Sequence, residues 1–261
     1  MALPALSYAY RWVRGRLRPV WTGVYTRYED VPVSGPGFEG ERWSAITRAS
    51  TEFALAAWRG GAPVRATGDR ALLPELAAGV LAERGEVRIV DFGGGMGISY
   101  VDVRAACGPV VLEYTVVETE AVCAAGRSLF AADSAIRFVT SLGQANQGAD
   151  IVYVSSALQY VPDPLAALRE LASLRARYML LVNLSAGEIP TYATAQRNVP
   201  GSVIGYWFLA LNVVTEVLQA EGYVQRRSSL SERTLTGFDV PRRYRLARGR
   251  NLLFEASPVS G

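Results

Sequence analysis

Short apolar runs alternate with amphipathic stretches over the last two thirds of the chain. Runs rich in Val, Ile and Leu have the length of buried strands. Strands are expected at 87–92, 113–118, 135–139, 149–156 and 177–184. Helix-compatible segments lie at 98–107, 121–131 and 164–176, and Asp163 is expected to cap the last of them. This alternation is typical of a doubly wound, mostly parallel sheet with helices on both faces.

The end of the chain departs from this alternation. A long excursion, 185–202, leads into an apolar segment at 203–220 that we interpret as a buried helix. Two further apolar runs, 222–230 and 250–257, follow with no helical pattern between them, so a terminal β-hairpin is expected. With the five earlier strands they predict an α/β fold with a Rossmann-like, seven-stranded sheet.

The first 85 residues have a different pattern. Breaks rich in Gly and Pro interrupt this region, two amphipathic helices are expected at 42–58 and 70–85, and no strand-like alternation is visible. The contrast predicts two domains. They are an N-terminal helical cap or lid, 1–85, and a Rossmann-like domain, 86–261.

The composition excludes several kinds of chemistry. The chain has no His, and its 27 basic residues are all Arg. It therefore lacks an imidazole base, a His-ligated metal and the lysine of a Schiff base or P-loop. Cys107 and Cys123 are too few for a structural zinc site, and we expect reduced thiols, no metal and a cytoplasmic protein. Any general acid or base in a catalytic step must therefore be an Asp, Glu, Tyr or Cys side chain.

Charge and hydropathy restrict the partners. A net charge of +3 is too small to indicate a nucleic-acid partner. No run reaches the roughly 18 apolar residues of a membrane span, and the N-terminus lacks the features of a signal peptide. The basic and aromatic segment 8–18 fits either a peripheral membrane contact or a cap helix packed on the protein, and we favour the cap helix.

The strongest chemical signal is the segment 90–100, VDFGGGMGISY. It has the pattern D-x-G-x-G-x-G from Asp91 to Gly97, and glycines let a backbone turn sharply and approach a ligand closely. A dinucleotide fingerprint that starts at Gly93 needs glycine at position 98, where Ile98 stands. Asp91 is poorly placed beside a pyrophosphate but well placed beside an ammonium group. S-adenosylmethionine (SAM) carries an ammonium group and a carboxylate that loop N–H groups can bind.

Glu118 supports SAM as the ligand. It ends the second expected strand, where nucleoside-binding α/β folds place the acid that binds ribose hydroxyls. That acid alone fits NAD as well as SAM, and the combination with Asp91 favours SAM. Two further pairs of candidates are Ser141 and Leu142, which come after the third strand, and Ser155 and Ser156, which end the fourth. The expected cofactor-binding residues are Asp91, Gly93, Gly94, Gly95, Gly97, Glu118, Ser141, Leu142, Ser155 and Ser156.

The motifs VDFGGGMG, TVVE, DIVYVSSALQYVPDP and GYVQ resemble, in order and spacing, those of class I SAM-dependent methyltransferases over about 87–225. More narrowly, FGGGMGISY, YTVVE, SSALQYVPDP and QRNVP resemble a family of bacterial methyltransferases associated with lipopolysaccharide and other surface-polysaccharide gene clusters. The segment VRATGDR, 64–70, departs from that family's Glu-Arg-Asp motif. Arg65 and Asp69 therefore have no assigned role.

The resemblance implies methyl transfer from SAM, with S-adenosylhomocysteine as product. The implied acceptor is a small molecule or glycan, through a hydroxyl of a sugar or surface-polysaccharide precursor; a natural-product hydroxyl is the alternative. Such an enzyme mainly aligns acceptor and methyl group in a dry pocket, which suits a chain without His or Lys. The candidate catalytic residues are Gln159, Tyr160 and Glu188, with Asp102 and Tyr192 as alternative bases. A methyltransferase-like binding or scaffold protein and a nicotinamide-dependent oxidoreductase remain open as other classes.

Overall fold

The computed structural model describes residues 19–145, 148–199 and 201–257. Within these ranges the main sheet has seven strands in the order β10-β12-β6-β5-β2-β3-β4. The parallel strands are β2 (Glu86–Phe92), β3 (Val111–Val117), β4 (Ile136–Val139), β5 (Ile151–Ser155) and β6 (Tyr178–Leu184). An antiparallel hairpin of β10 (Tyr223–Thr234) and β12 (Arg248–Ala256) extends one edge. The predicted Rossmann-like sheet with its terminal hairpin is confirmed.

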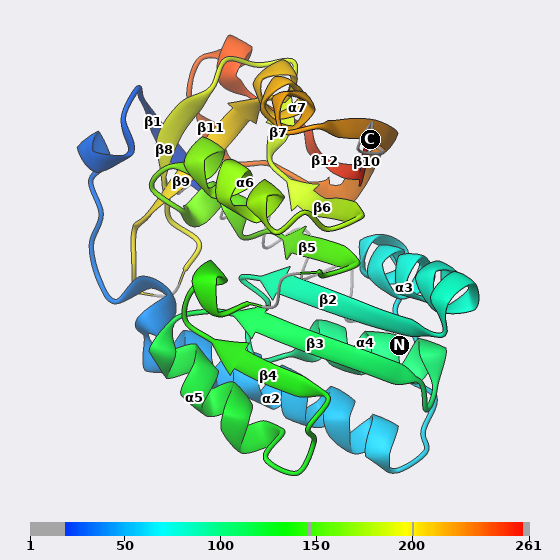
Figure 1. Cartoon of the computed structure of the whole chain (residues 1–261). Coiled ribbons are helices and arrows are strands. Elements are labelled where there is room, and N and C mark those ends of the chain that lie inside the picture. Colours follow the sequence, from blue (N-terminus) through cyan, green and yellow to red (C-terminus); the bar gives the residue numbers. More distant parts are fainter. Residues whose placement is uncertain (1–18, 146–147, 200, 258–261) are drawn as a thin grey trace, which may run out of the picture.

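Helices cover both faces of this sheet (Figure 1). One face carries α2 (Glu41–Arg59), α3 (Leu72–Arg84), α4 (Ile98–Cys107) and α5 (Glu120–Leu129). The other carries α6 (Pro164–Ser173) and α7 (Leu211–Ala220). The Asp163 carboxylate accepts hydrogen bonds from the N–H groups of Leu165 and Ala166, at 3.1 and 2.9 Å, so the predicted cap of α6 is confirmed.

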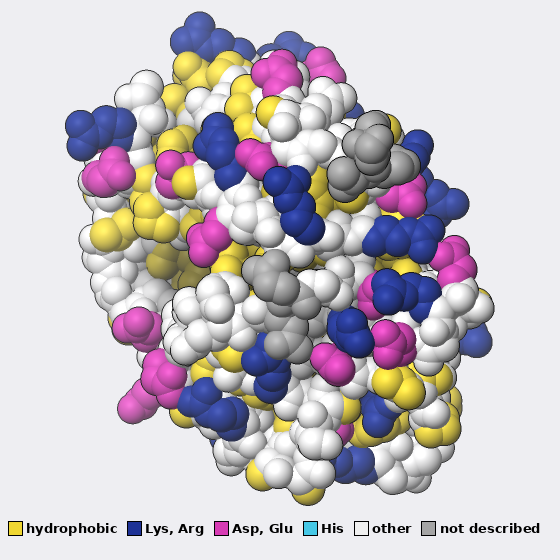
Figure 2. Space-filling view, in the orientation of Figure 1, with side chains coloured by type: hydrophobic (Ala, Val, Ile, Leu, Met, Phe, Trp, Pro, Cys, Tyr) yellow, Lys and Arg dark blue, Asp and Glu magenta, His cyan; other side chains and the backbone are white. Residues whose placement is uncertain are grey.

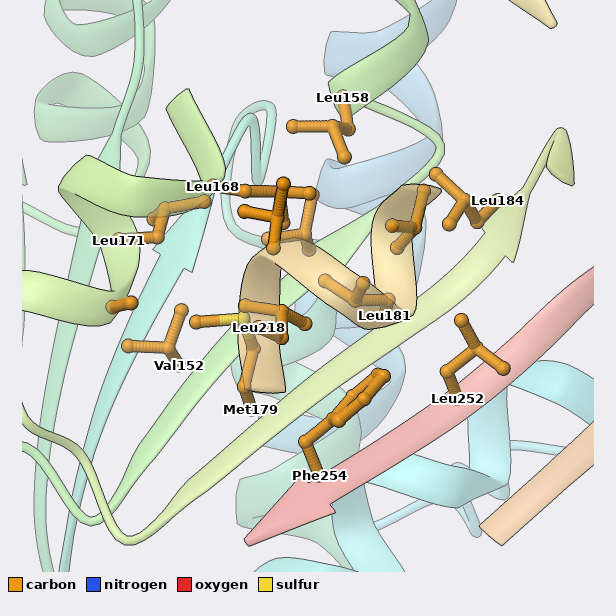
Figure 3. Packing of buried hydrophobic residues seen from close by; sticks show 14 of the residues in the cluster. Val152, Leu158, Leu168, Leu171, Met179, Leu181, Leu184, Leu218, Leu252 and Phe254 are labelled. Carbon is orange, nitrogen blue, oxygen red and sulfur yellow. The ribbon is translucent and has the colours of Figure 1, made fainter. Parts of the chain in front are cut away.

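A hydrophobic cluster between the sheet and the helices α6 and α7 fixes the strands β5 and β6 (Figure 3). Val152 of β5 and Met179 and Leu181 of β6 pack with Leu168 of α6 and Leu218 of α7, and all five side chains are fully buried. Met179 and Leu181 are two residues apart in a strand, so they share one face. Burying such a side chain contributes roughly 1.5–3 kcal/mol, and the packing holds the carboxyl ends of these strands in place.

The strand order reverses between β2 and β5. From β2 the chain passes to β3 and β4 on one side and then returns to β5 on the other side of β2. In open α/β sheets, ligands bind in the crevice outside the carboxyl ends of the strands at such a reversal. Phe92 and Ser155 end these two neighbouring strands, so the glycine loop and the segment after β5 emerge side by side.

A second sheet, which the sequence did not predict, has five strands in the order β11-β1-β8-β9-β7 (Figure 1). Its strands are β1 (Trp21–Tyr25), β7 (Ala186–Gly187), β8 (Tyr192–Gln196), β9 (Ile204–Ala210) and β11 (Phe238–Asp239). β8 is antiparallel to both β1 and β9. The sheet therefore joins the N-terminal region, the excursion after β6 and the segment before β12.

Two sequence expectations need correction. The predicted helix at 203–220 is wrong in its first part, because Ile204–Ala210 forms β9 and only Leu211–Ala220 is helical. Both parts are apolar, and periodicity alone does not separate a buried strand from a buried helix. The expectation of no strand before residue 86 is also wrong, because Trp21–Tyr25 forms β1.

The predicted division at residue 85 stays a prediction. This position lies between α3 and β2, and side chains of both elements belong to one hydrophobic cluster. The basic, aromatic segment 8–18 lies outside the described residues. Among the helices that the structure describes, none combines the length and apolar character needed to cross a membrane. On the face seen in Figure 2, arginine and acidic side chains are interspersed, so this face presents no field of a single sign.

Candidate active site

Asp91 lies at the carboxyl end of β2, with its side chain only 1% exposed. One carboxylate oxygen accepts a hydrogen bond from the Tyr114 hydroxyl at 2.7 Å, and the other, Oδ1, is buried without a partner. Burial raises the pKa of Asp91 to about 7; the Tyr114 hydrogen bond opposes this rise and the charge of Glu118 adds to it. A buried carboxylate with an unused oxygen is costly, and a cation placed beside it would offset that cost.

The glycine loop that follows wraps around this carboxylate. A Cβ atom on Gly94 would come within 2.4 Å of the Asp91 carboxylate, so only glycine leaves room there. Gly97 has a φ of 91° in the left-handed region and forms the N-cap of α4. The loop therefore joins the acid at the end of β2 to a helix N-terminus, whose free N–H groups favour anions.

Glu118 follows β3 and is tied to the same loop. Its Oε1 accepts a hydrogen bond from the Gly95 N–H at 3.2 Å, and its Oε2 accepts one from the Thr119 N–H at 3.0 Å. Burial raises the pKa of Glu118, and these two backbone hydrogen bonds oppose the rise. The structure thus brings together Asp91, the glycine loop and Glu118 at the carboxyl ends of β2 and β3.

The weaker cofactor candidates lie at the ends of the neighbouring strands. Ser141 is exposed and Leu142 is buried, at the start of the 3-10 turn η4 (Leu142–Gln144) after β4. Ser155 ends β5. Ser156 has a φ of 55°, and Asn183 near the end of β6 has a φ of 53°. Non-glycine residues in the left-handed region are strained, and such strain clusters at functional sites.

Gln159 and Tyr160 lie in the 3-10 turn η5 (Leu158–Tyr160) after β5. This turn is next to the glycine loop, because a Cβ on Gly93 would lie 2.3 Å from the Cβ of Ala157. The Gln159 side chain is fully buried, and its Nε2 donates to the Asn183 carbonyl at 3.3 Å. Burial raises the pKa of Tyr160 far above its ordinary value, so its hydroxyl stays protonated and acts as a hydrogen-bond group rather than an anionic base.

Aromatic side chains surround Tyr160. Its ring makes edge-to-face contacts with Phe38 and Tyr206, at centroid distances of 4.7 and 5.0 Å. Phe38 also contacts Trp43 at 5.3 Å, and both are half-buried. Phe38, Trp43 and Tyr206 were not among the residues predicted for the site. No period of two marks Tyr206 in the sequence, because Tyr206, Trp207 and Phe208 follow one another in an unbroken apolar run.

Within the described ranges, Glu188 makes no polar contact that would place it with Gln159 and Tyr160. It is exposed just after β7, and among the described residues no hydrogen bond or ion pair joins it to Gln159, Tyr160 or the glycine loop. Its role as a base stays a prediction.

The two alternative bases make structural contacts. The Asp102 carboxylate, only 4% exposed, accepts hydrogen bonds from Arg70 Nη2 and Nε at 2.7 and 3.1 Å. This pair ties the turn η3 (Gly68–Ala71) to α4. The Tyr192 hydroxyl donates to the Tyr244 carbonyl at 2.7 Å. Both polar groups are therefore engaged in holding the fold.

Asp69, which had no assigned role, anchors η3 to the terminal hairpin. Its carboxylate accepts hydrogen bonds from the Ser231 hydroxyl at 3.0 Å, the Glu232 N–H at 2.8 Å and Asn251 Nδ2 at 2.7 Å. Asn251 Oδ1 in turn accepts a hydrogen bond from the N–H of Asn183 at 2.9 Å. The network thus fixes the strained end of β6 beside the crevice.

Comparison with known proteins agrees with this topology. No family model and no curated protein sequence matches the chain. Among solved structures, the Burkholderia thailandensis 1,6-didemethyltoxoflavin-N1-methyltransferase, with 1,6-didemethyltoxoflavin and S-adenosylhomocysteine bound, matches with a TM-score of 0.50. The match has 15% sequence identity and covers 88% of this chain and 93% of that one. The chain shares the Rossmann-like fold of that enzyme.

A second solved structure is similar. The magnesium protoporphyrin IX methyltransferase of Synechocystis PCC 6803, with SAM bound, matches with a TM-score of 0.47 and 16% identity over 82% of this chain and 97% of that one. At 15% identity, the match to the Burkholderia thailandensis enzyme shows the fold of this chain, and the reaction and the acceptor are left to the residues of the site.

Proposed function

We propose that the protein is a SAM-dependent methyltransferase. The observation that carries the proposal is the buried Oδ1 of Asp91, which has no partner and lies beneath a glycine loop at the reversal of strand order. A ligand with an ammonium group supplies the missing donor and compensates the buried charge. The fold similarity to methyltransferases supports the same proposal.

The residues present fit SAM group by group. Asp91 would bind the ammonium group, the N–H groups at the start of α4 would bind the carboxylate, and Glu118 would bind the ribose hydroxyls. Ser141 and Leu142 would border the adenine, and Ser155 and Ser156 would border the reacting end. Bound SAM supplies a methyl group on a sulfonium, whose leaving group is already activated.

The chain's own contribution is to position the acceptor and exclude water. Phe38 packs against Trp43 and against Tyr160. Tyr160 and the buried Gln159 lie in the turn η5, whose preceding residue Ala157 lies against Gly93 of the loop. We propose a small-molecule acceptor that is methylated on a hydroxyl. A sugar or surface-polysaccharide precursor and a natural product are the two acceptor classes to test. The ligand of the Burkholderia thailandensis enzyme is a small molecule, which supports an acceptor of this size.

We further propose that residues 1–85 act as a cap on the SAM-binding domain, 86–261, in the cytoplasm. The structure leaves Cys107 and Cys123 as free thiols, which agrees with a reducing compartment.

Calorimetric titration with SAM, S-adenosylhomocysteine and NAD tests the proposal. We expect saturable binding of SAM and S-adenosylhomocysteine and none of NAD; binding of NAD alone would contradict it. Mass spectrometry of the purified protein for retained S-adenosylhomocysteine gives an independent measurement. If SAM binds and no acceptor from either class is methylated, the binding or scaffold function is the correct one.

A further inference from the structure

Three buried polar atoms between η5 and the five-stranded sheet have no hydrogen-bond partner. They are Gln159 Oε1, Gln196 Oε1 and Trp21 Nε1. Their side chains are 0%, 2% and 1% exposed. Roughly nine in ten buried polar groups in native proteins are paired, so three unpaired groups in one region call for an explanation.

The three groups surround one pair of tyrosines. Trp21 and Gln196 are cross-strand partners in β1 and β8. The Trp21 ring packs on Tyr206 at a centroid distance of 4.5 Å, and Tyr206 packs on Tyr160 at 5.0 Å. Burial raises the pKa of both tyrosines. Gln196 lowers the pKa of Tyr160, and Gln159 lowers the pKa of Tyr206, each against the larger effect of burial. The two glutamines and the indole therefore border the same pair of tyrosines.

This cluster is continuous with the crevice at the glycine loop. Gln159 and Tyr160 share the turn η5, and Ala157, just before this turn, lies against Gly93. Phe38 also packs on Tyr160, at a centroid distance of 4.7 Å. A molecule held between these side chains lies next to the loop proposed for SAM.

Arg233 contributes a positive charge to the surroundings of the two tyrosines. It is exposed, its positive charge lowers the pKa of both Tyr160 and Tyr206 against the effect of burial, and no ion-pair partner for it occurs among the described residues. A cationic ligand is disfavoured beside it, and a neutral or anionic one is not.

We propose that Gln159, Gln196 and Trp21 bind the methyl acceptor, and that the acceptor is a neutral or anionic molecule with at least two hydroxyl groups. A hydroxyl donates to an amide oxygen and accepts from an indole N–H, whereas an ammonium group only donates. The two glutamines then determine specificity. This inference rests on the proposed methyltransferase function.

Paired probes on the protein saturated with S-adenosylhomocysteine test it. Catechol is compared with 1,2-dimethoxybenzene, which has no donor, and 3,4-dihydroxybenzoate with 3,4-dihydroxybenzylamine, which differs in charge. We expect calorimetry to give about tenfold or tighter binding of the first member of each pair. Because this comparison uses the wild-type protein, it does not depend on whether any variant folds.

Substitutions identify the groups responsible. Gln159→Met and Gln196→Met should each weaken catechol binding about tenfold or more and leave S-adenosylhomocysteine affinity within about twofold. Gln219→Met, at an exposed position on α7, is the matched control and should change neither.

Equal binding within both pairs, or no binding of any probe, would overturn the inference, as would a preference for catechol that survives in both glutamine variants. Failure of the wild-type protein to bind S-adenosylhomocysteine instead contradicts the proposed function itself, so the two failures are distinguishable.

Discussion

Asp91 and Glu118 lie at the ends of neighbouring parallel strands and are joined through one glycine loop. Gly94 lies directly over the Asp91 carboxylate, and the N–H of the next residue, Gly95, donates to Glu118 at 3.2 Å. The negative charge of Glu118 helps to raise the pKa of Asp91, after the larger effect of burial. A cation beside Asp91 relieves both effects, and this is the physical basis of the proposed SAM site.

The affinity for SAM should depend on pH through Asp91. Its pKa is raised to about 7, and only the ionised form attracts an ammonium group. Affinity should therefore be highest above pH 7 and fall by up to about tenfold for each pH unit below it. In Asp91→Asn this dependence should disappear. Calorimetry at about pH 6, 7 and 8 measures it, and an identical pH profile in the variant would refute the assignment.

Stability should respond to pH in the opposite direction. A carboxyl group whose pKa is raised by folding stabilises the fold below its unfolded pKa, near 4, and this contribution is lost as the pH rises through about 7. Without ligand, Asp91→Asn should therefore melt at a higher temperature than the wild type at about pH 8, with a smaller difference near pH 5. Thermal unfolding followed by circular dichroism measures both values. A melting temperature lowered equally at both pH values contradicts the account.

Gly94→Ala should disrupt cofactor binding by displacing Asp91. The new Cβ would meet the carboxylate at 2.4 Å, and Gly94 is not among the residues with positive φ, so this clash is the main effect. We expect a loss of about 1–3 kcal/mol in stability and of tenfold or more in SAM affinity. Gly143→Ala is the matched control, because a Cβ there meets no atom within 4 Å. Equal effects of the two substitutions would refute this explanation.

Glu118→Gln should weaken SAM binding by roughly 10- to 100-fold, because hydrogen bonds from ribose to a charged acceptor contribute about 1.5–3 kcal/mol. The amide oxygen can still accept from the Gly95 N–H, so the fold should persist. Glu75→Gln, on the exposed side of α3, serves as control. The fluorescence of the tryptophans on SAM titration gives the affinities, and an unchanged value in Glu118→Gln removes this residue from the site.

Arg70→Ala should lower stability without changing SAM affinity. It leaves the Asp102 carboxylate, only 4% exposed, without its ion-pair partner. The expected loss is about 1–3 kcal/mol, near the lower end because the Arg70 side chain is 54% exposed. Urea unfolding measures it, with Arg169→Ala on the surface of α6 as control. A large loss of methyl transfer at unchanged stability would instead restore Asp102 as a candidate base.

The glycine loop could be predicted from the sequence because the residues that determine its conformation are close together in the chain. Asp91, the glycines and Ile98 follow one another directly, and the strand before them is short and apolar. The same holds for the cap of α6, where Asp163 and Pro164 suffice. Residues close in sequence determined both structures.

The five-stranded sheet could not be predicted in this way. In this sheet Trp21 of β1 pairs with Gln196 of β8 on one side and with Phe238 of β11 on the other. A local sequence pattern does not indicate strand partners that are so far away in the chain. For the same reason no role could be predicted for Asp69, whose partner Asn251 is 182 residues away. The polar cluster around Tyr160 exists only once these segments have assembled.

Calorimetric titration of the wild-type protein and Asp91→Asn with SAM and with NAD, at about pH 8, tests the central claim most directly. The account predicts saturable SAM binding to the wild type, a loss of about tenfold or more in the variant, and no binding of NAD to either. NAD binding to the wild type, or SAM binding of equal affinity in the two proteins, would contradict it.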